Sequence, residues 1–195
     1  MRRSPPALAR LLLALCLWVS PGYGLQNALT ETLALWPEEA QRLRVGLKLF
    51  PACLGALESL EKRLAPDGSL HVLVVYQGAD DTARQVVLSL AKVGNIRGLT
   101  LVVQAISATA LDADRDMFVS AVFVASVGVP GKRLQAWSEQ HQALVFSPFD
   151  GDVEAGAVAG IDVTDRILPY INVDQTRRAG LRFKSFFLDV ARQHD

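Results

Sequence analysis

The order of apolar and polar positions along the chain predicts alternating strands and helices. Residues 70–76 read Leu-His-Val-Leu-Val-Val-Tyr, a β-rich run that is apolar on both faces. Such a run is typical of a central strand covered by helices. An apolar helical stripe follows at 83–91, capped by Asp81, and residues 99–106 form a second apolar run. Strand, helix and strand in this order predict a βαβ unit with parallel strands and a right-handed crossover.

Residues 25–64 carry a mostly helical pattern. Apolar side chains at spacings close to three and four share one face, namely Ala40, Leu43, Leu47, Phe50, Leu54, Leu57 and Leu64. Pro51 lacks an amide donor and is expected to break or kink this helix. Leu43, Val45, Leu47 and Leu49 also alternate as a strand would, and this alternative stays open beside the helix.

The second half of the chain predicts further elements of both kinds. Residues 118–125 and 143–146 are predicted strands, with a short helix between them after Pro130. Residues 157–163 and 166–171 predict a hairpin whose second arm Pro169 confines to an edge or an irregular position. Asn172 and Gln175 have the spacing of a capping box. The final helix that they open places five apolar side chains on one face, namely Ala179, Phe183, Phe186, Phe187 and Val190.

These elements predict an α/β fold in a single three-layer domain. A mostly parallel sheet has helices on both faces, and a C-terminal β-hairpin and a final packed helix complete it. The chain has 195 residues, of which 50% are hydrophobic and 21% charged, and this is enough for a packed core. No repeat or long linker divides it, so residues 25–195 are expected to form one domain.

The N-terminus has the pattern of a secretory signal peptide over residues 1–24. Three arginines precede an apolar run at 11–19, and small residues stand before a cut after Gly24. The run is too short to span a bilayer comfortably, since spanning takes roughly 20 apolar residues. We therefore expect export to the periplasm, with an uncleaved N-terminal anchor as the alternative.

Charge and cysteine content exclude several classes of protein. The 20 basic and 20 acidic residues balance in the whole chain, and so offer no general field for nucleic acid. Removal of residues 1–24 leaves 17 basic and 20 acidic residues, a formal charge of −3. The same cut leaves Cys53 as the only thiol, and its apolar neighbours predict that it is buried and inert.

No catalytic motif or cofactor site is found, so we expect a non-enzymatic protein. His71, His141 and His194 are far apart in the sequence, and HExxH, Gly-x-Ser-x-Gly and CxxC are absent from it. Asp112, Asp114 and Asp116 imitate the opening of a calcium loop. The glycine and glutamate that such a loop needs are missing, which predicts a solvated acidic loop and no metal.

The turn after the first strand does not favour nucleotides. Gln77-Gly78-Ala79 supplies one glycine, whereas phosphate cradles use several. Asp80 and Asp81 would repel a phosphate and are interpreted as helix caps.

Two surfaces are candidates for binding. In a parallel sheet, ligands lie beyond the carboxyl ends of the strands. The polar residues expected there are Gln77, Ser107, Ser126 and Ser147. A cluster of cations in the last predicted helix could meet an acidic partner surface or lipid headgroups. It consists of Arg177, Arg178, Arg182 and Lys184.

The last 40 residues resemble the closing motif of YfiR-like periplasmic proteins. The matching segments are Gly156-Ala157-Val158-Ala159-Gly160-Ile161, Tyr170-Ile171-Asn172, Arg178-Ala179-Gly180-Leu181 and Phe186-Phe187-Leu188-Asp189-Val190-Ala191. The pattern is a glycine-led hairpin, an Ile-Asn step and a helix that opens with Ala-Gly-Leu. Within the helix, Gly180 costs about 1 kcal/mol relative to alanine, which suggests close packing there.

The resemblance implies a function beyond the inner membrane. YfiR-like proteins restrain a membrane-bound diguanylate cyclase by binding its periplasmic sensor region, and some relatives are encoded beside sensor kinases. We therefore expect a regulator that binds a membrane signalling protein. A periplasmic small-ligand receptor is the alternative, and a homodimer stays open. Family members often carry paired redox-active cysteines, which this chain lacks.

Overall fold

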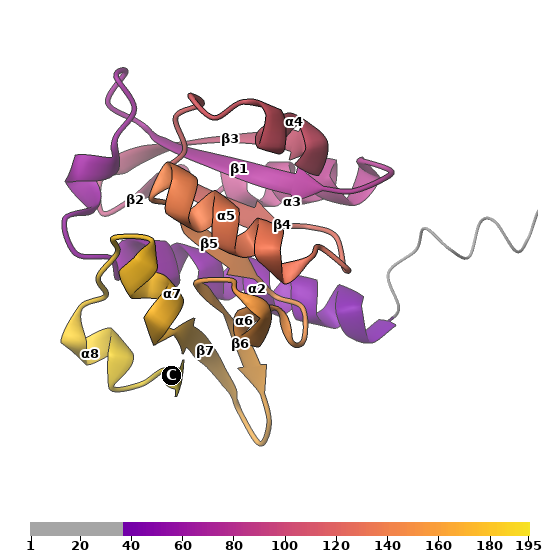
Figure 1. Cartoon of the computed structure of the whole chain (residues 1–195), viewed down its shortest axis with the longest axis vertical. Coiled ribbons are helices and arrows are strands. Elements are labelled where there is room, and N and C mark those ends of the chain that lie inside the picture. Colours follow the sequence, from indigo (N-terminus) through magenta and orange to yellow (C-terminus); the bar gives the residue numbers. More distant parts are fainter. Residues whose placement is uncertain (1–36) are drawn as a thin grey trace, which may run out of the picture. The chain divides into compact units, whose positions relative to one another are not determined.

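The computed structural model describes residues 37–195, which form one eight-stranded sheet in the order β2-β3-β1-β4-β5-β6-β7-β8 (Figure 1). The parallel strands are β3 (Leu99–Ser107), β1 (Leu70–Tyr76), β4 (Ala121–Val124), β5 (Leu144–Ser147) and β6 (Ala159–Val163). The two-residue β2 (Asn95–Ile96) is antiparallel to β3. At the other end, β7 (Ile167–Asn172) is antiparallel to β6, and β8 (Arg192–His194) is parallel to β7.

Helices cover both faces of this sheet. They are α2 (Pro37–Gly55), α3 (Asp81–Ala91), α4 (Ala108–Ala113), α5 (Gly131–His141), α6 (Asp152–Ala155), α7 (Val173–Arg178) and α8 (Ser185–Leu188), with a 3₁₀ turn η2 at Leu60–Arg63. The crossover through α3 runs from β1 toward β3. The crossovers through α4 and α5 run in the opposite direction along the sheet, to β4 and then to β5. Right-handed crossovers therefore put α3 on one face and α4 and α5 on the opposite face. Figure 1 shows α5 in front of the sheet, and α2 contacts α3, β5 and β6. The three-layer α/β fold is confirmed.

The core forms where α2 packs on the central strands. Phe50 of α2 has its ring centroid 5.4 Å from that of Phe123 in β4 and 5.6 Å from that of Phe146 in β5. Cys53, one turn further along α2, is fully buried, and burial raises the pKa of its thiol to about 12. The prediction that this cysteine is buried is confirmed.

The central strands and the hairpin agree with the pattern of the sequence. Strand β1 has the predicted limits, and five of its seven side chains, Leu70 and Val72 to Val75, are fully buried between the helical layers. The predicted hairpin is β6 and β7. Pro169 lies opposite Ile161 of β6, and β8 pairs with β7 only from Tyr170 onward. The proline therefore occupies a position with no neighbour on the β8 side, as expected.

The first helix ends earlier than predicted, at Gly55, so Leu57 and Leu64 lie beyond it, and it is not broken at Pro51. Its described part is one continuous helix, α2, and Pro51 lies inside it without ending it. The buried face that includes Phe50, Cys53 and Leu54 holds the last turn on the sheet, which outweighs the hydrogen bond that proline cannot donate. The strand alternative at Leu43 to Leu49 is excluded.

Several short elements were not predicted from the sequence. They are β2, α4, α6 and β8, none longer than six residues. Strand β4 is shorter than predicted, and Phe118, placed in it by the pattern, lies before it and is half exposed. Asp80, rather than Asp81, is the N-cap residue of α3, and its side chain bonds Arg84 instead of the helix amides.

The predicted final helix is wrong. Helix α7 ends at Arg178, the chain then runs extended so that Leu57 and Phe183 form a β-bridge, and α8 begins only at Ser185. Phe183 and Phe187 are buried with their rings stacked, 5.6 Å apart. Phe186 and Val190, predicted on the same buried face, are 63% and 60% exposed because the helix that would align them is interrupted.

The interruption is a Schellman motif at the end of α7. The Leu181 amide donates to the Thr176 carbonyl at 2.9 Å, and the Gly180 amide donates to the Arg177 carbonyl at 3.0 Å. Gly180 adopts φ +65°, the left-handed conformation typical of this motif. An added Cβ there would have no neighbour within 4 Å. Ala-Gly-Leu thus closes a helix instead of opening one, and Gly180 serves the turn rather than close packing.

Whether a helix can span a membrane depends on its length and apolarity. Among residues 37–195, no helix is long and apolar enough to cross a bilayer. The predicted signal peptide, residues 1–24, lies outside the described residues, as does the start of the predicted helical segment at residue 25.

Candidate functional site

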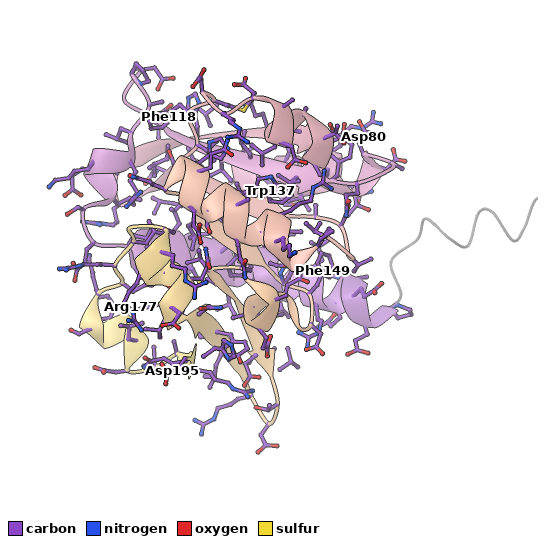
Figure 2. All side chains as sticks on the ribbon, in the orientation of Figure 1. Asp80, Phe118, Trp137, Phe149, Arg177 and Asp195 are labelled. Carbon is purple, nitrogen blue, oxygen red and sulfur yellow. The ribbon has the colours of Figure 1, made fainter. Side chains whose placement is uncertain are left out.

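The sheet reverses its winding direction between β1 and β4. From β1 the chain passes through α3 to β3 on one side, and from β3 it crosses back through α4 to β4 on the other side. The loops that leave the carboxyl ends of β1 and β4 therefore diverge. In open α/β sheets this is the switch point at which ligands bind. Asp80 and Phe149 mark the edge of the sheet on which it lies (Figure 2).

Gln77 and Ser126 meet at this switch point. Gln77 follows β1 directly, and Ser126 lies two residues beyond the end of β4. The Gln77 amide donates to the Ser126 hydroxyl oxygen at 3.0 Å, and that hydroxyl lies 3.5 Å from the Gln77 carbonyl oxygen, to which it donates. Two of the four residues proposed for the ligand site from the sequence are therefore brought together.

Arg133 joins Gln77 to an acidic residue on α4. Its Nη1 donates to Gln77 Oε1 at 3.1 Å, while its Nε and Nη2 donate to Asp112 Oδ2 at 2.9 and 2.5 Å. Trp137 Nε1 donates to the other carboxylate oxygen of Asp112 at 2.7 Å. The guanidinium carbon also lies 5.9 Å from the centre of the Trp137 ring. These contacts fix Arg133 in one position at the switch point.

The group of Gln77, Asp112, Arg133 and Trp137 was not predicted from the sequence. Asp112 was predicted to be part of a solvated loop, and this is wrong: it lies on α4 and accepts hydrogen bonds from Arg133 and Trp137. Trp137 falls in the short helix predicted after Pro130, and no role at a site was predicted for it. One signal was available. Arg133 lies in the first turn of α5, the helix that follows β4, and the first turns of such helices lie at the carboxyl edge of a parallel sheet.

Ser107 and Ser147 serve their own loops. Ser107 is the N-cap of α4, and its hydroxyl accepts from the Ala110 amide at 3.2 Å. Ser147 is fully buried at the end of β5, where its hydroxyl donates to Asp152 at 2.5 Å and accepts from the Phe149 amide at 3.3 Å. Neither hydroxyl is directed to the group around Gln77.

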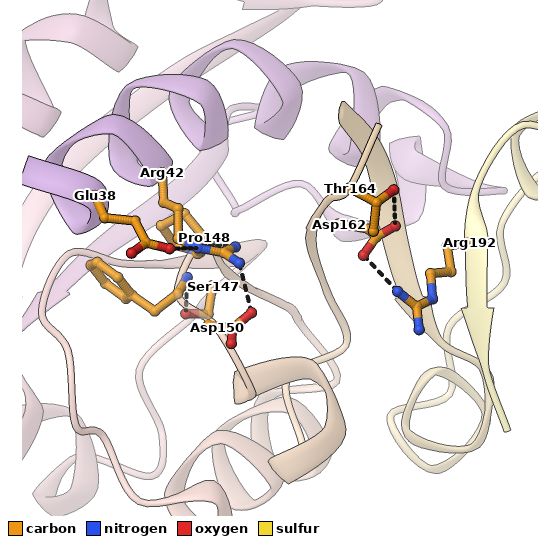
Figure 3. Close-up of polar contacts among 9 residues, drawn as sticks. Glu38, Arg42, Ser147, Pro148, Asp150, Asp162, Thr164 and Arg192 are labelled. Carbon is orange, nitrogen blue, oxygen red and sulfur yellow. Dashed lines mark hydrogen bonds and ion pairs between the residues drawn. The ribbon is translucent and has the colours of Figure 1, made fainter. Parts of the chain in front are cut away.

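The loop after β5 is fixed by charge as well. Arg42 of α2 donates to Asp150 at 2.6 Å and to the Pro148 carbonyl at 3.5 Å (Figure 3). The pKa of the Asp152 carboxyl is raised to about 6, chiefly by burial and also by the neighbouring Glu154 and Asp150, whereas the hydrogen bond from Ser147 lowers it. The loop after β5 is thus held to α2 by the contact of Arg42 with Asp150, and to α6 by the hydrogen bond from Ser147 to Asp152.

The residues of the closing motif have structural roles. Asn172 is the N-cap of α7: its Oδ1 accepts from the Gln175 amide, and its Nδ2 donates to the Val153 carbonyl, both at 2.8 Å. The Gln175 side chain does not complete the predicted capping box, since it donates to Ser138 at 2.8 Å. A Cβ on Gly160 would lie 2.4 Å from the Ser147 carbonyl oxygen. Ala179 and Leu181 are buried beside the Schellman turn.

The predicted cation cluster does not lie on one helix. Arg177 and Arg178 are exposed in the last turn of α7, and Arg177 bonds Asp174 (Figure 2). Arg182 and Lys184 lie in the segment between α7 and α8, whose backbone pairs with residues 56–58. The three histidines also stay apart, with different partners: His71 with Asp67, His141 with the Met117 carbonyl and His194 with the Tyr170 ring.

Comparison with known proteins gives matches among solved structures alone. No family model matches the chain, and no curated protein does. The ABC domain from Streptococcus pneumonia in complex with L-Trp aligns at 14% identity and a TM-score of 0.47, over 72% of this chain and 61% of its own. A conserved domain protein from Vibrio cholerae O1 biovar eltor aligns at 13% identity and a TM-score of 0.48, over 70% and 60%.

A third structure is the ligand-free, open form of CD0873 from Clostridium difficile, a substrate binding protein with adhesive properties. It aligns at 16% identity and a TM-score of 0.49, over 77% of this chain and 58% of its own. The chain thus spans about three fifths of the length of the structures that it matches.

Proposed function

We propose that this protein is a receptor for a small ligand that presents a carboxylate or carbonyl oxygen at the carboxyl ends of β1 and β4. The observation that carries the proposal is the position of Arg133 and Gln77 at the switch point of the sheet, linked to each other at 3.1 Å. A crevice at such a point is where open α/β sheets bind ligands.

The donors that remain free define the chemistry of the ligand. A guanidinium has five N–H groups, and Arg133 uses three of them on Gln77 and Asp112. One N–H on each terminal nitrogen therefore has no partner in the described part of the chain. Gln77 accepts through Oε1, which leaves its Nε2 donors equally available. A site that offers donors in this way favours acceptor oxygens.

The charge around the site limits the ligand further. Asp112 neutralises Arg133, while Asp80 ends the loop that follows Gln77 and Asp81 begins α3. A polyphosphate would be repelled by these carboxylates. A neutral ligand or one with a single negative charge is compatible with the site. Because Arg133 is about 29% exposed, a ligand can reach its free N–H groups without unfolding the domain.

Export and the lack of enzymatic activity are part of this proposal. Support for export comes from the pattern of residues 1–24, and support for binding without catalysis comes from a sequence that lacks the catalytic motifs considered above. The interaction with a membrane signalling protein, which the YfiR-like resemblance implies, stays a prediction.

Thermal denaturation in the presence of small carboxylic acids, amino acids and amides tests the receptor function. A ligand at 100 times its dissociation constant adds about 2.7 kcal/mol of stability. Arg133→Lys keeps the charge and removes the planar fork, and Gln77→Ala removes the second donor. Each is expected to weaken binding about tenfold or more, since a hydrogen bond to a charged group contributes about 1.5–3 kcal/mol.

Arg84→Lys is the matched control, because Arg84 is also paired with an aspartate in the region after β1 but lies outside the linked group. A ligand that binds wild type, Arg133→Lys and Gln77→Ala with equal affinity contradicts the proposed site. Absence of any stabilisation across the panel contradicts the receptor function.

A further inference from the structure

The segment around α8 exposes large apolar side chains beside cations. Phe186 is 63% exposed and Val190 is 60% exposed, although their neighbour Phe187 is buried in the core. Exposed apolar patches that are rimmed by polar groups mark protein or membrane interaction sites. The two side chains lie four residues apart, at the start and just after the end of α8.

Three cations lie close to these apolar side chains in the sequence. Arg178, Arg182 and Lys184 form no ion pair with the described residues, whereas Arg177 is paired with Asp174. The Lys184 ammonium lies 6.0 Å from the centre of the Phe186 ring, so charge and apolar surface are in contact. Asp189 is the single acidic residue between Phe186 and Val190. We call Arg178, Arg182, Lys184, Phe186 and Val190 the C-terminal patch.

We propose that the C-terminal patch docks on an anionic lipid surface, with Phe186 and Val190 entering the headgroup region and the cations meeting lipid phosphates. The sign of the charge supports this, because the patch has an excess of cations in a chain that without residues 1–24 carries a formal charge of −3. Each basic residue near an anionic membrane contributes about 1 kcal/mol of attraction.

The size of the patch favours lipid over a protein partner. A stable protein interface buries about 800 Å² on each partner around an apolar centre. Two exposed apolar side chains are too few for such a centre, and the segments beside them, α7 and the turn at 56–58, present charged side chains. A bilayer needs no complementary shape, and attachment to it depends on the apolar area buried together with the electrostatic attraction to anionic lipids.

Sedimentation with vesicles tests the proposal on the full chain. Vesicles of phosphatidylcholine alone are compared with vesicles that also contain phosphatidylglycerol, at low and high salt. Phe186→Ser with Val190→Ser, and Arg178→Glu with Arg182→Glu, are each expected to lower the partition onto anionic vesicles about tenfold or more. High salt should weaken the binding of wild type because it screens the charges.

Matched variants control for general effects of apolarity and charge. Leu88→Ser replaces a side chain that is 65% exposed on α3, and Lys92→Glu with Arg115→Glu reverses two exposed cations elsewhere. The apolar run at 11–19 is present in every variant, so differences between variants report the C-terminal patch. Unchanged melting temperatures verify folding.

Three results would overturn the proposal. The first is equal binding of wild type to neutral and anionic vesicles. The second is a loss in the control variants as large as in the patch variants. The third is capture of an acidic membrane protein through the C-terminal patch with no affinity for anionic vesicles, which would assign the surface to a protein partner.

Discussion

Replacement of Asn172 by alanine tests whether the closing motif is structural. The side chain makes two buried hydrogen bonds of 2.8 Å, one from the Gln175 amide and one to the Val153 carbonyl. Loss of an N-cap costs about 1 kcal/mol. Loss of the donor to a buried carbonyl adds about 1 kcal/mol, the low end of the range, because the Gly156 amide still donates to Val153 at 3.3 Å. We expect Asn172→Ala to destabilise the protein by about 2 kcal/mol.

Urea unfolding measures this difference. With a slope of about 2 kcal/mol per molar urea, the midpoint should fall by about 1 M. Asn172→Ser keeps a cap acceptor and loses only the bond to Val153, so it should cost about half as much. Asn172→Asp also keeps the acceptor but directs a carboxylate oxygen at the Val153 carbonyl, and it should be less stable than the serine variant.

Two results would refute this reasoning. A free energy of unfolding for Asn172→Ala within about 0.5 kcal/mol of wild type would show that the two bonds contribute little, since surface substitutions have effects of that size. Equal destabilisation by serine and alanine would show that the cap itself contributes nothing.

Other predictions concern two glycines and one carboxyl. Gly180→Ala should lower the free energy of unfolding by about 1–2 kcal/mol, because φ is +65° there, although an added Cβ would meet no neighbour. Gly180→Asn should lower it less in the same urea assay. Gly160→Ala should cost about 1–3 kcal/mol for the opposite reason, a Cβ 2.4 Å from the Ser147 carbonyl oxygen, and asparagine should be no better there. Asp152 has a pKa of about 6 when folded and about 3.9 when unfolded, so the folded state binds more protons between these values. The wild type should therefore lose stability relative to Asp152→Asn as the pH rises from about 4 to about 6, which melting temperatures across that range would reveal.

Much of the central fold could be predicted because its signals are local. The residues of β1 are apolar at every position but His71 and so on both faces of the strand, and no other element accommodates that pattern so well. The same is true of the βαβ unit, and of the hairpin around Thr164-Asp165. Asn172 could be identified as a cap because the required spacing to Gln175 lies within one turn.

The C-terminal region shows where a periodic pattern is misleading. Ala179, Phe183 and Phe187 have helical spacing and are all buried, yet no helix connects them. Gly180 adopts a left-handed conformation and the residues after it pair with residues 56–58, so Phe183 is buried from an extended segment. Spacing in the sequence reports which side chains are buried, and it does not report by which backbone route.

Only part of the candidate site could be predicted from the sequence. The general rule for parallel sheets indicated Gln77 and Ser126, because it depends only on where strands end. Asp112, Arg133 and Trp137 could not be assembled in the same way, since they meet across α4 and α5 over separations of 21 to 25 residues.

The sequence by itself therefore determined the apolar runs, the cap at Asn172, the turn of the β6–β7 hairpin and the α/β class, because these follow from neighbouring residues. The tertiary structure alone decided that Arg133 is held between Gln77 and Asp112, that Ser147 is committed to Asp152, and that Phe186 faces outward. Each of these depends on how the layers pack around the sheet, and packing brings together side chains whose distance in the sequence carries no information about their contact.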